Sequence, residues 1–551
     1  MTLRAWPRRV ARRAVVATAA LLAGGWLGER LLDLAWPFPI EALARGGAST
    51  VVRAADGSVL RVTADRLGER CLPTALDDVA PLLLTALQTA EDRRFAAHGG
   101  VDLLALVRAA WASACAGRVV SGGSTLSMQL VRIAEPRPRT LRSKLVELLR
   151  ARQLERRLSK RELLEAYVAR VPLGGVRGFE AAAWRWFGRR CVELLPAEAA
   201  LLVAMLPAPS RLRPDRAPAE LRARRDRLLD ELHAAGHLDE AAWQAARATP
   251  LPAAPQPWPF LAPWACEAAL YEAPNATRRD GGEVATAIDR ALQERLDACV
   301  AAADPAGADG VAAVVVRRSD GAFTAISGGR RFACDRSHAA LARRDAGSTL
   351  KPFLVALALE GGVASSREPV VDAPRQFGDF APRNFDDSYR GAQSLREALL
   401  QSRNVPAVAL LADVGAAPFG ELLGALGLEP GARPLDLTAA LGTVAVAPLA
   451  LARAYARFAD PRAQLLVGAA ARRQVVDWLA EGPPLPGFPA SRAVAWKTGT
   501  SSGRRDAWCV AIGADHVVVV WKGNLAGGGA ADLVGVQTAA PLCAAVVALL
   551  P

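Results

Sequence analysis

The sequence has few of the residues that build metal centres. It contains five histidines and eight cysteines in 551 residues, and the cysteines form no C-x-x-C pair and no zinc-type spacing with histidine. A metal cluster as an organising element is therefore excluded. We expect mainly buried free thiols. Some disulfides are an alternative, because the chain is expected to be exported.

Signatures of nucleic-acid binding are also missing, despite a formal net charge of +13. No segment resembles a zinc finger, an RNA-recognition signature or a basic helix with interleaved aromatic residues. We therefore expect no nucleic-acid partner. The positive charge favours an anionic membrane surface or a pyrophosphate group, or else it reflects arginines on a solvated surface.

An uncharged run at 14–28 follows arginines at positions 4, 8, 9, 12 and 13. By the positive-inside rule, the N-terminus stays in the cytoplasm and the rest of the chain is exported. The run is short for a span, which usually takes about 20 residues, so the flanking arginines would have to reach the interface. We predict a cytoplasmic tail and signal anchor over 1–40; a cleaved signal peptide is the alternative.

The length predicts two globular domains, because one hydrophobic core stops growing below this size. A hairpin-like stretch at 50–62 precedes mainly helical patterns, and Pro81 suits a first helical position. Residues 250–259 are too rich in proline for a helix or a central strand. We predict a mainly α domain at 41–249, a linker at 250–282 and an α/β domain at 283–551.

The loop 91–100 combines Glu91 and Asp92 with two arginines and two glycines. Inverting glycosyl transfer needs a carboxylate that deprotonates the attacking hydroxyl and cations that hold the departing diphosphate. Taken alone, Glu91 and Arg94 could equally be an ion pair at a helix end. Lys144 and Glu147 share one helix face by their spacing, either as a solvated pair or together in a cleft.

The wider pattern resembles a peptidoglycan glycosyltransferase of the lysozyme-like, mainly α fold. The matching segments are 91–100, 122–132, 142–155, 158–169, 178–188 and 206–210. The resemblance implies that Glu91 is the general base on lipid II and that Glu147 assists at the donor diphosphate, directly or through a divalent cation (Mg or Mn). It also implies substrate binding by Arg94, Ser124, Thr125, Gln129, Arg132 and Lys144. Arg132 replaces a frequent lysine, and Ala169 replaces an expected asparagine.

A second group of motifs is Ser348-Thr349-Leu350-Lys351, Ser402-Arg403-Asn404 and Lys497-Thr498-Gly499-Thr500. Ser348 begins an apolar helix, where the dipole favours developing negative charge. Lys351 could deprotonate Ser348 only if burial and a nearby cation such as Lys497 depress its pKa. Strand alternation places Lys497 and Gly499 on one face, where glycine leaves room for a substrate or the active-site helix.

In this order and spacing, the motifs resemble the acyl-serine site of a penicillin-binding transpeptidase. The resemblance implies an antiparallel sheet with helices, Ser348 as nucleophile and Lys351 as its base. Ser402 would shuttle a proton between Lys497 and the leaving amine, Asn404, Thr498, Gly499 and Thr500 would bind substrate, and backbone N–H groups of Ser348 and Thr500 would form the oxyanion hole. A class A β-lactamase would need a Glu-x-x-x-Asn loop that is not found, whereas a D,D-carboxypeptidase stays open.

Together the two patterns resemble a bifunctional class A penicillin-binding protein, most like the 1C group without its additional C-terminal domain. This implies polymerisation of lipid II and cross-linking of stem peptides through an acyl-serine intermediate. The expected partners are lipid II, nascent peptidoglycan, β-lactam antibiotics, the cytoplasmic membrane and proteins of the cell-wall machinery. No organic cofactor is expected. A membrane-anchored scaffold or β-lactam-binding protein with a decayed glycosyltransferase is the alternative that Ala169 keeps open.

Overall fold

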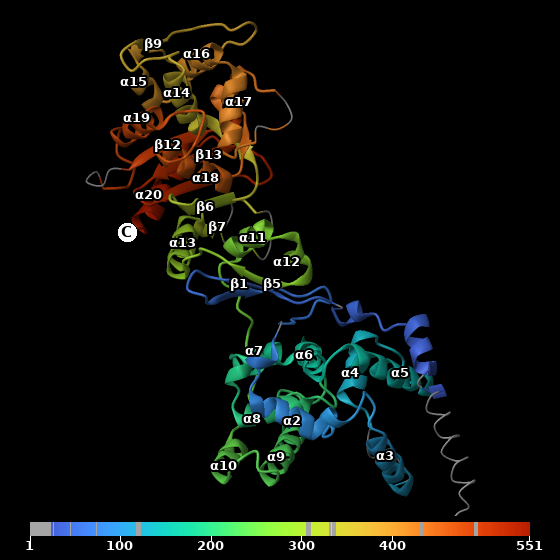
Figure 1. Ribbon diagram of the computed structural model, residues 1–551. Helices are drawn as coiled ribbons and strands as arrows, with labels where there is room; N and C mark the ends of the chain where they lie inside the picture. The colour runs from blue at the N-terminus through green and yellow to red at the C-terminus, as the bar shows by residue number, and fades with distance from the viewer. Residues whose placement is uncertain are drawn as a thin grey trace, which may run out of the picture. The chain divides into compact units, whose positions relative to one another are not determined.

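The computed structural model divides the chain into two compact units (Figure 1). The first comprises Met1–Val51, Val62–Trp258 and Pro274–Gly282, and the second Val52–Arg61, Pro259–Ala273 and Glu283–Pro551. The structure describes the chain except for residues 1–23, 26, 45, 73, 117–122, 305–309, 330–331, 333–337, 430, 432–433 and 490–493.

The first unit is mainly helical, as predicted. Its helices are α2 (Pro81–Glu91), α3 (Leu103–Ala116), α4 (Leu126–Ala134), α5 (Leu141–Arg157), α6 (Lys160–Arg170), α7 (Phe179–Phe187), α8 (Pro196–Met205), α9 (Pro218–Ala234), α10 (Glu240–Ala248) and α12 (Asn275–Asp280), with a hairpin of β3 (Pro172–Leu173) and β4 (Val176–Arg177). Pro81 is the first residue of α2 because its missing N–H would have no helical acceptor there. Ser159 and Glu162 form a capping box that starts α6.

The predicted anchor falls mostly on residues 1–23 and 26, which lie outside the described residues. The helical residues 27–35 are tied to α5 by ion pairs, Asp33 with Arg156 at 2.5 Å and Glu29 with Arg152 at 2.9 Å. In the described part of the chain, no single helix is long and apolar enough to cross a membrane. The helices Asn404–Val414 and Ala416–Ala425 meet that length and composition only as a pair, bent by 96°.

The second unit is built on a five-stranded antiparallel sheet, which confirms the predicted fold class. The strand order is β12 (Ala495–Thr500), β13 (Asp506–Ile512), β14 (His516–Gly523), β6 (Gly310–Arg317) and β7 (Phe323–Ser327). Alternate residues of β6 enter two cores: Val314 packs with α14 and α18, whereas Val315 packs with α13 and α20. The sheet is therefore covered by helices on both faces.

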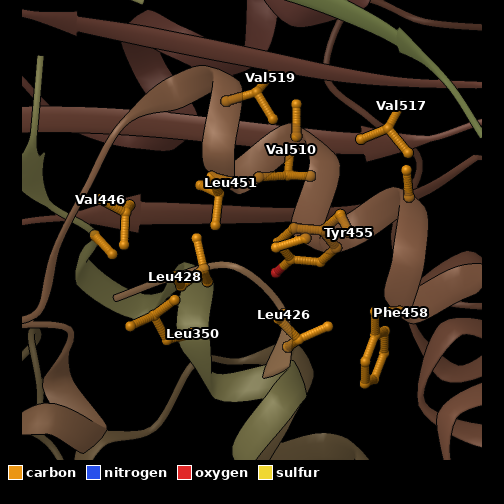
Figure 2. Close-up of a cluster of buried hydrophobic side chains, with 14 of the residues drawn as sticks. Leu350, Leu426, Leu428, Val446, Leu451, Tyr455, Phe458, Val510, Val517 and Val519 are labelled. Carbon is orange, nitrogen blue, oxygen red and sulfur yellow. The ribbon is translucent and has the colours of Figure 1, made fainter. Parts of the chain in front are cut away.

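The helices of this unit are α11 (Pro263–Glu272), α13 (Arg290–Ala303), α14 (Lys351–Glu360), α15 (Leu395–Leu400), α16 (Asn404–Val414), α17 (Ala416–Ala425), α18 (Pro448–Ala459), α19 (Ala469–Ala480) and α20 (Ala540–Ala548). Two small antiparallel pairs join β9 (Pro369–Asp372) to β10 (Gly391–Ser394) and β8 (Arg344–Asp345) to β11 (Ala445–Val446). A 3-10 turn, η6 (Gly347–Leu350), precedes α14. Figure 2 shows Leu350 of this turn in the apolar core with Leu451, Tyr455 and Phe458 of α18.

The domain boundaries differ from those predicted. The 250–282 segment is not only a linker, because α11 and α12 form once the prolines end at Pro259 and Pro263 takes a first helical position. The hairpin strands β1 (Thr50–Arg53) and β2 (Val59–Val62) form a three-stranded sheet with β5 (Gly282–Ala285), in which β1 is the central strand. Residues 52–61 belong to the second unit because Val52, Ala54 and Leu60 enter its core.

The cysteines agree with the prediction of free thiols as far as the structure describes them. Cys71, Cys115, Cys191, Cys266, Cys299, Cys509 and Cys543 are all free, and Cys334 lies outside the described residues.

Candidate active sites

Glu91 is the last residue of α2 and lines a cavity of about 600 Å³ in the first unit. Residues quoted from the first two glycosyltransferase-like motifs share this lining, among them Arg94, Gly123 and Ser124. Gly122 lies outside the described residues. The helix end and the residues before α4 thus bring a carboxylate, an arginine and a hydroxyl to one cleft, although they are 30 residues apart in the sequence.

A short hydrogen-bond chain orients the carboxylate of Glu91. Gln129 Nε2 donates to Glu91 Oε2 at 2.7 Å, and the buried Tyr167 hydroxyl donates to Gln129 Oε1 at 2.8 Å. Burial raises the pKa of Glu91, and the bond from Gln129 partly opposes this. Burial also holds the pKa of Tyr167 well above its ordinary value, so this hydroxyl remains a donor. One oxygen of Glu91 is fixed, and the other is left to take a proton.

The residue after Glu91 fixes the loop that follows. The carboxylate of Asp92 lies 3.0 Å from His98 Nε2 and accepts the Leu126 backbone N–H at 3.1 Å. His98 Nδ1 accepts the Gly100 N–H at 3.2 Å, so the donor proton of a neutral ring is on Nε2. No role for Asp92 or His98 was predicted, because their contact and burial depend on the tertiary structure.

Arg132, Lys144 and Glu147 form a compact charge cluster. Arg132 donates from Nε and Nη2 to the two oxygens of Glu147 at 3.0 and 3.1 Å, and Lys144 Nζ lies 3.3 Å from Glu147 Oε2. Lys144 also donates to Ser124 Oγ at 2.7 Å. Burial by itself would raise the pKa of Glu147, but Arg132 and Lys144 outweigh it and hold that pKa below its ordinary value. The cluster keeps Glu147 ionised beside two cations and reaches the Glu91 cleft through Ser124.

These residues do not form a cage for a divalent cation. Arg132 already occupies both oxygens of Glu147, and the described residues contain no group of three or more potential metal ligands. A divalent cation at the donor diphosphate therefore stays a prediction from the sequence. Arg132 and Lys144 are the positive charges that the protein places beside Glu147.

The hydroxyl of Thr125 is engaged within the protein. It donates to the Gly100 carbonyl at 2.6 Å and accepts the Met128 N–H at 3.2 Å as the cap of α4. Thr125 lines the cleft and joins two of its loops, and its predicted role in substrate binding stays a prediction.

Replacing Tyr167 by phenylalanine is expected to slow glycan polymerisation about tenfold, because Gln129 would lose the bond that fixes its amide. The expected change is in kcat more than in KM, since Tyr167 is buried behind Glu91. Rates of polymerisation over a range of labelled lipid II concentrations measure both constants. Tyr271→Phe, at an exposed tyrosine in the other unit, is the control. Equal kcat values for Tyr167→Phe and the wild type would contradict the role of the hydrogen bonds from Tyr167 through Gln129 to Glu91.

In the second unit, η6 lies against strand β12. A Cβ on Gly499 would stand 2.6 Å from the Ala346 carbonyl, and one on Gly347, whose φ is +56°, would stand 2.8 Å from the backbone of Thr500. The prediction that Gly499 leaves room for the active-site helix is confirmed, as is its position on the same face as Lys497. Ser348 is thereby held at the edge of the sheet.

Lys351 is almost fully buried and donates three hydrogen bonds. Its Nζ lies 2.7 Å from the Ser402 carbonyl, 3.1 Å from the Arg403 carbonyl and 2.7 Å from Asn404 Oδ1. Burial, with the charges of Lys497 and Arg403, holds the pKa of Lys351 well below its ordinary value. Among the described residues, Lys351 makes no hydrogen bond with the Ser348 hydroxyl. Lys351 would have to lose a proton before its nitrogen has a lone pair that can accept the proton of Ser348.

Ser402 connects the second lysine to this group. Lys497 Nζ donates to Ser402 Oγ at 2.8 Å and to the Thr498 carbonyl at 2.9 Å. Burial lowers the pKa of Lys497 to about 8. Ser402 has a φ of +58°, a strained conformation for a residue with a side chain, and such strain clusters at functional sites.

The turn that carries Ser402 is fixed by a buried acid outside the predicted motifs. Asp372 accepts from Arg403 Nε and Asn384 Nδ2, both at 2.7 Å, and Asn384 Oδ1 accepts the Asn404 N–H at 2.8 Å. Asn404 also donates from Nδ2 to the Arg383 carbonyl at 2.8 Å. The amide of Asn404, predicted as a substrate anchor, is therefore bonded at both ends by the protein.

The second unit has a cleft of about 660 Å³ beside these hydrogen-bonded groups. Its lining includes Ser348, Ser402, Asn404, Thr498, Gly499 and Thr500. The hydroxyls of Ser348 and Ser402 thus line one cleft, and the two lysines of depressed pKa bond to residues of its lining, Lys351 to Asn404 and Lys497 to Ser402. This arrangement is suited to acyl transfer through serine.

Acylation at Ser348 is expected to rise with pH as Lys351 loses its proton and to fall above about pH 8 as Lys497 loses its own. Lys497→Gln removes a positive charge near Lys351, so the pKa of Lys351 should rise and the ascending limb should move to higher pH. Rates of labelling by a fluorescent penicillin measure this. Lys522→Gln, on β14 outside the cleft, should leave the profile unchanged; an unmoved ascending limb in Lys497→Gln would contradict the coupling.

Comparison with known proteins agrees with both sites. The chain matches the transglycosylase family over residues 57–233 and the penicillin-binding protein transpeptidase domain over residues 311–466. It is 34% identical to penicillin-binding protein 1C of Escherichia coli over 97% of this chain and 72% of that protein. It is 32% identical to penicillin-binding protein 1B of Vibrio cholerae over 81% of this chain and 65% of the relative.

A solved structure shares the fold. Penicillin-binding protein 1A from Haemophilus influenzae aligns over 92% of each chain with a TM-score of 0.57 and 17% sequence identity. Lys497 lies beyond the matched transpeptidase segment, so its place in the site rests on the geometry given above.

Proposed function

The chain belongs to the class A penicillin-binding proteins and is a bifunctional peptidoglycan synthase, and on that premise we propose which residues carry its two reactions. The observation behind the proposal is that residues from motifs distant in sequence line one cleft in each unit, and that the remaining charged motif residues are joined to these clefts by hydrogen bonds. The glycosyltransferase cleft contains Glu91, and the transpeptidase cleft contains Ser348.

For polymerisation, Glu91 would take the proton of the attacking hydroxyl of lipid II as that oxygen bonds to the anomeric carbon of the donor. Its burial raises its pKa toward that of a useful base, and Gln129 keeps one oxygen in place. Arg132 and Lys144 would stabilise the diphosphate that departs on undecaprenol, with Glu147 fixing both cations. Arg94, which lines the cleft near Glu91, would bind substrate.

For cross-linking, neutral Lys351 would deprotonate Ser348, whose oxygen attacks the penultimate D-alanine carbonyl of a stem peptide. The backbone N–H groups of Ser348 and Thr500 would stabilise the oxyanion. Ser402 would pass a proton from Lys497 to the departing D-alanine amine, a route supported by the 2.8 Å bond between them. An amine of a second stem peptide would then release the acyl group.

We also propose that residues 1–40 hold the chain in the cytoplasmic membrane with the N-terminus inside and both catalytic units outside. The arginines before residue 14 support this orientation. Lipid II, peptidoglycan and β-lactams are the ligands that this placement makes accessible, and other proteins of the cell-wall machinery are its expected partners.

The alternative with a decayed glycosyltransferase rests on Ala169. That residue is buried, its carbonyl accepts the Cys71 thiol at 3.3 Å, and it is not among the residues lining the cavities at Glu91 and Arg132. The position that departs from the family pattern therefore lies behind the site, which favours an active enzyme.

Purified protein given lipid II with and without penicillin tests the proposed function. We expect cross-linked glycan chains without the antibiotic and linear chains with it. Penicillin-sensitive release of D-alanine without cross-links would instead indicate a carboxypeptidase, and absence of chains would indicate a scaffold.

A further inference from the structure

The transpeptidase unit contains a second cavity, of about 830 Å³, whose lining shares no residue with the cleft around Ser348. It is bounded by the turn between β6 and β7, residues 426–429 after α17, strand β11 and helix α18. This volume lies in the range of about 300–1,000 Å³ typical of small-molecule sites. Neither proposed reaction uses it.

One wall of the cavity is apolar. Leu426, Leu428, Val446 and Leu449 line it, and all four are buried members of the core that also contains Leu350. Figure 2 shows Leu426, Leu428 and Val446 in one cluster with Leu350. The wall can therefore receive an apolar ligand body, and it adjoins the turn of the nucleophile.

Among the charged side chains that line the cavity, one arginine is available to bind a ligand. The cavity acids other than the exposed Glu429 are paired, as Glu272–Arg453, Asp320–Arg317 and Asp460–Arg462. Arg318 and Arg343 donate to backbone carbonyls. The guanidinium of Arg457, one turn after Arg453 on α18, has no hydrogen-bond or ion-pair partner among the described residues. A guanidinium in this state suits a carboxylate, which it can bind with two parallel hydrogen bonds.

Two of the four segments that bound the cavity, α18 and β11, also contact the segment that carries the nucleophile. On the opposite face of α18, the Tyr455 hydroxyl donates to the Thr349 carbonyl at 2.5 Å. Strand β11 pairs with β8, and the Ala346 N–H donates to the Val444 carbonyl at 3.1 Å. A ligand that shifts α18 or β11 would therefore move residues adjacent to Ser348.

We propose that this cavity is a second ligand site, which takes a small molecule with an apolar body and one carboxylate and which, when occupied, changes the rate of Ser348 acylation. The carboxylate pairs with Arg457, and the apolar body lies on Leu428 and Val446. Binding is independent of the proposed function, whereas the effect on acylation rests on Ser348 as the nucleophile.

The test of binding uses 4-biphenylacetate and, as a matched neutral probe, 4-biphenylacetamide, observed by saturation-transfer NMR with the full chain. Arg457→Gln should weaken the carboxylate about fivefold, as expected for one partly exposed charge pair, and leave the amide unchanged. Ala450→Trp, which fills the cavity, should remove binding of both probes. Arg473→Gln, an exposed arginine on α19 outside the cavity, is the control. Carboxylate binding that survives Arg457→Gln and Ala450→Trp unchanged would overturn the site.

The test of coupling is the rate of Ser348 labelling by a fluorescent penicillin at saturating 4-biphenylacetate. We expect a change of about twofold or more in the wild type and none in Ala450→Trp. An unchanged wild-type rate would overturn the coupling. Absence of labelling without any probe would instead contradict Ser348 as the nucleophile, so the two failures are distinguishable.

Discussion

Ser348→Ala is expected to abolish covalent labelling by penicillin and cross-linking of stem peptides, lowering acylation by at least about a thousandfold, because the variant lacks the oxygen that forms the acyl bond. The hydroxyl makes no hydrogen bond recorded among the described residues, and the turn is held by its backbone against Gly499 and Thr500. The variant should therefore fold normally. Gel fluorescence after labelling and muropeptide analysis measure the loss.

Glycan polymerisation provides the internal control, since Ser348→Ala should still convert lipid II into linear chains through the Glu91 cleft. Ser366→Ala, at an exposed position in the same unit, should label as the wild type does. Labelling of Ser348→Ala at the wild-type rate would refute the nucleophile and, with it, the proposed roles of Lys351 and Ser402.

Glu91→Gln is expected to reduce polymerisation of lipid II by about a hundredfold or more, the usual contribution of a general base. The amide keeps an oxygen that can accept from Gln129 Nε2, so the hydrogen-bond chain to Tyr167 survives while the basic lone pair is lost. The loss should appear in kcat. Chain length and yield from labelled lipid II, resolved on gels, give the measurement.

Glu231→Gln is the matched control for Glu91→Gln. Glu231 lines the same cleft, but it is exposed and paired with Arg93 at 2.6 Å, so its removal should have little effect on the rate. Penicillin labelling of both variants should equal that of the wild type, because Ser348 belongs to the other unit. A wild-type polymerisation rate in Glu91→Gln would exclude this carboxylate as the base.

Patterns of local origin were predictable from the sequence. The start of α2 at Pro81 follows from the missing proline N–H, and the common face of Lys497 and Gly499 follows from the two-residue period of a strand. The antiparallel sheet was expected only through the family resemblance, and its strand order confirms it.

Other features depend on contacts that no local pattern encodes. Tyr167 lies 38 residues from Gln129, and Asp372 lies 31 residues from Arg403, so their bonds form only after the chain folds. Thr125 and Asn404 were predicted to bind substrate from their motifs, yet their polar atoms are taken by Gly100, Met128, Lys351 and Arg383. The helices within 250–282 were not predicted because the linker was inferred from the proline-rich run 250–259, whereas α11 starts beyond it, at Pro263.

The sequence by itself determined the family, the two chemistries and the identity of the motif residues, because residue type and spacing fix which groups can act as acid, base or nucleophile. The tertiary structure decided how those groups are tuned. Burial of Lys351 beside Lys497 and Arg403 depresses its pKa, and burial of Glu91 beside Gln129 both raises its pKa and fixes one oxygen. Desolvation and charge proximity are properties of packed space, and so they appear only when segments distant in the sequence are brought together.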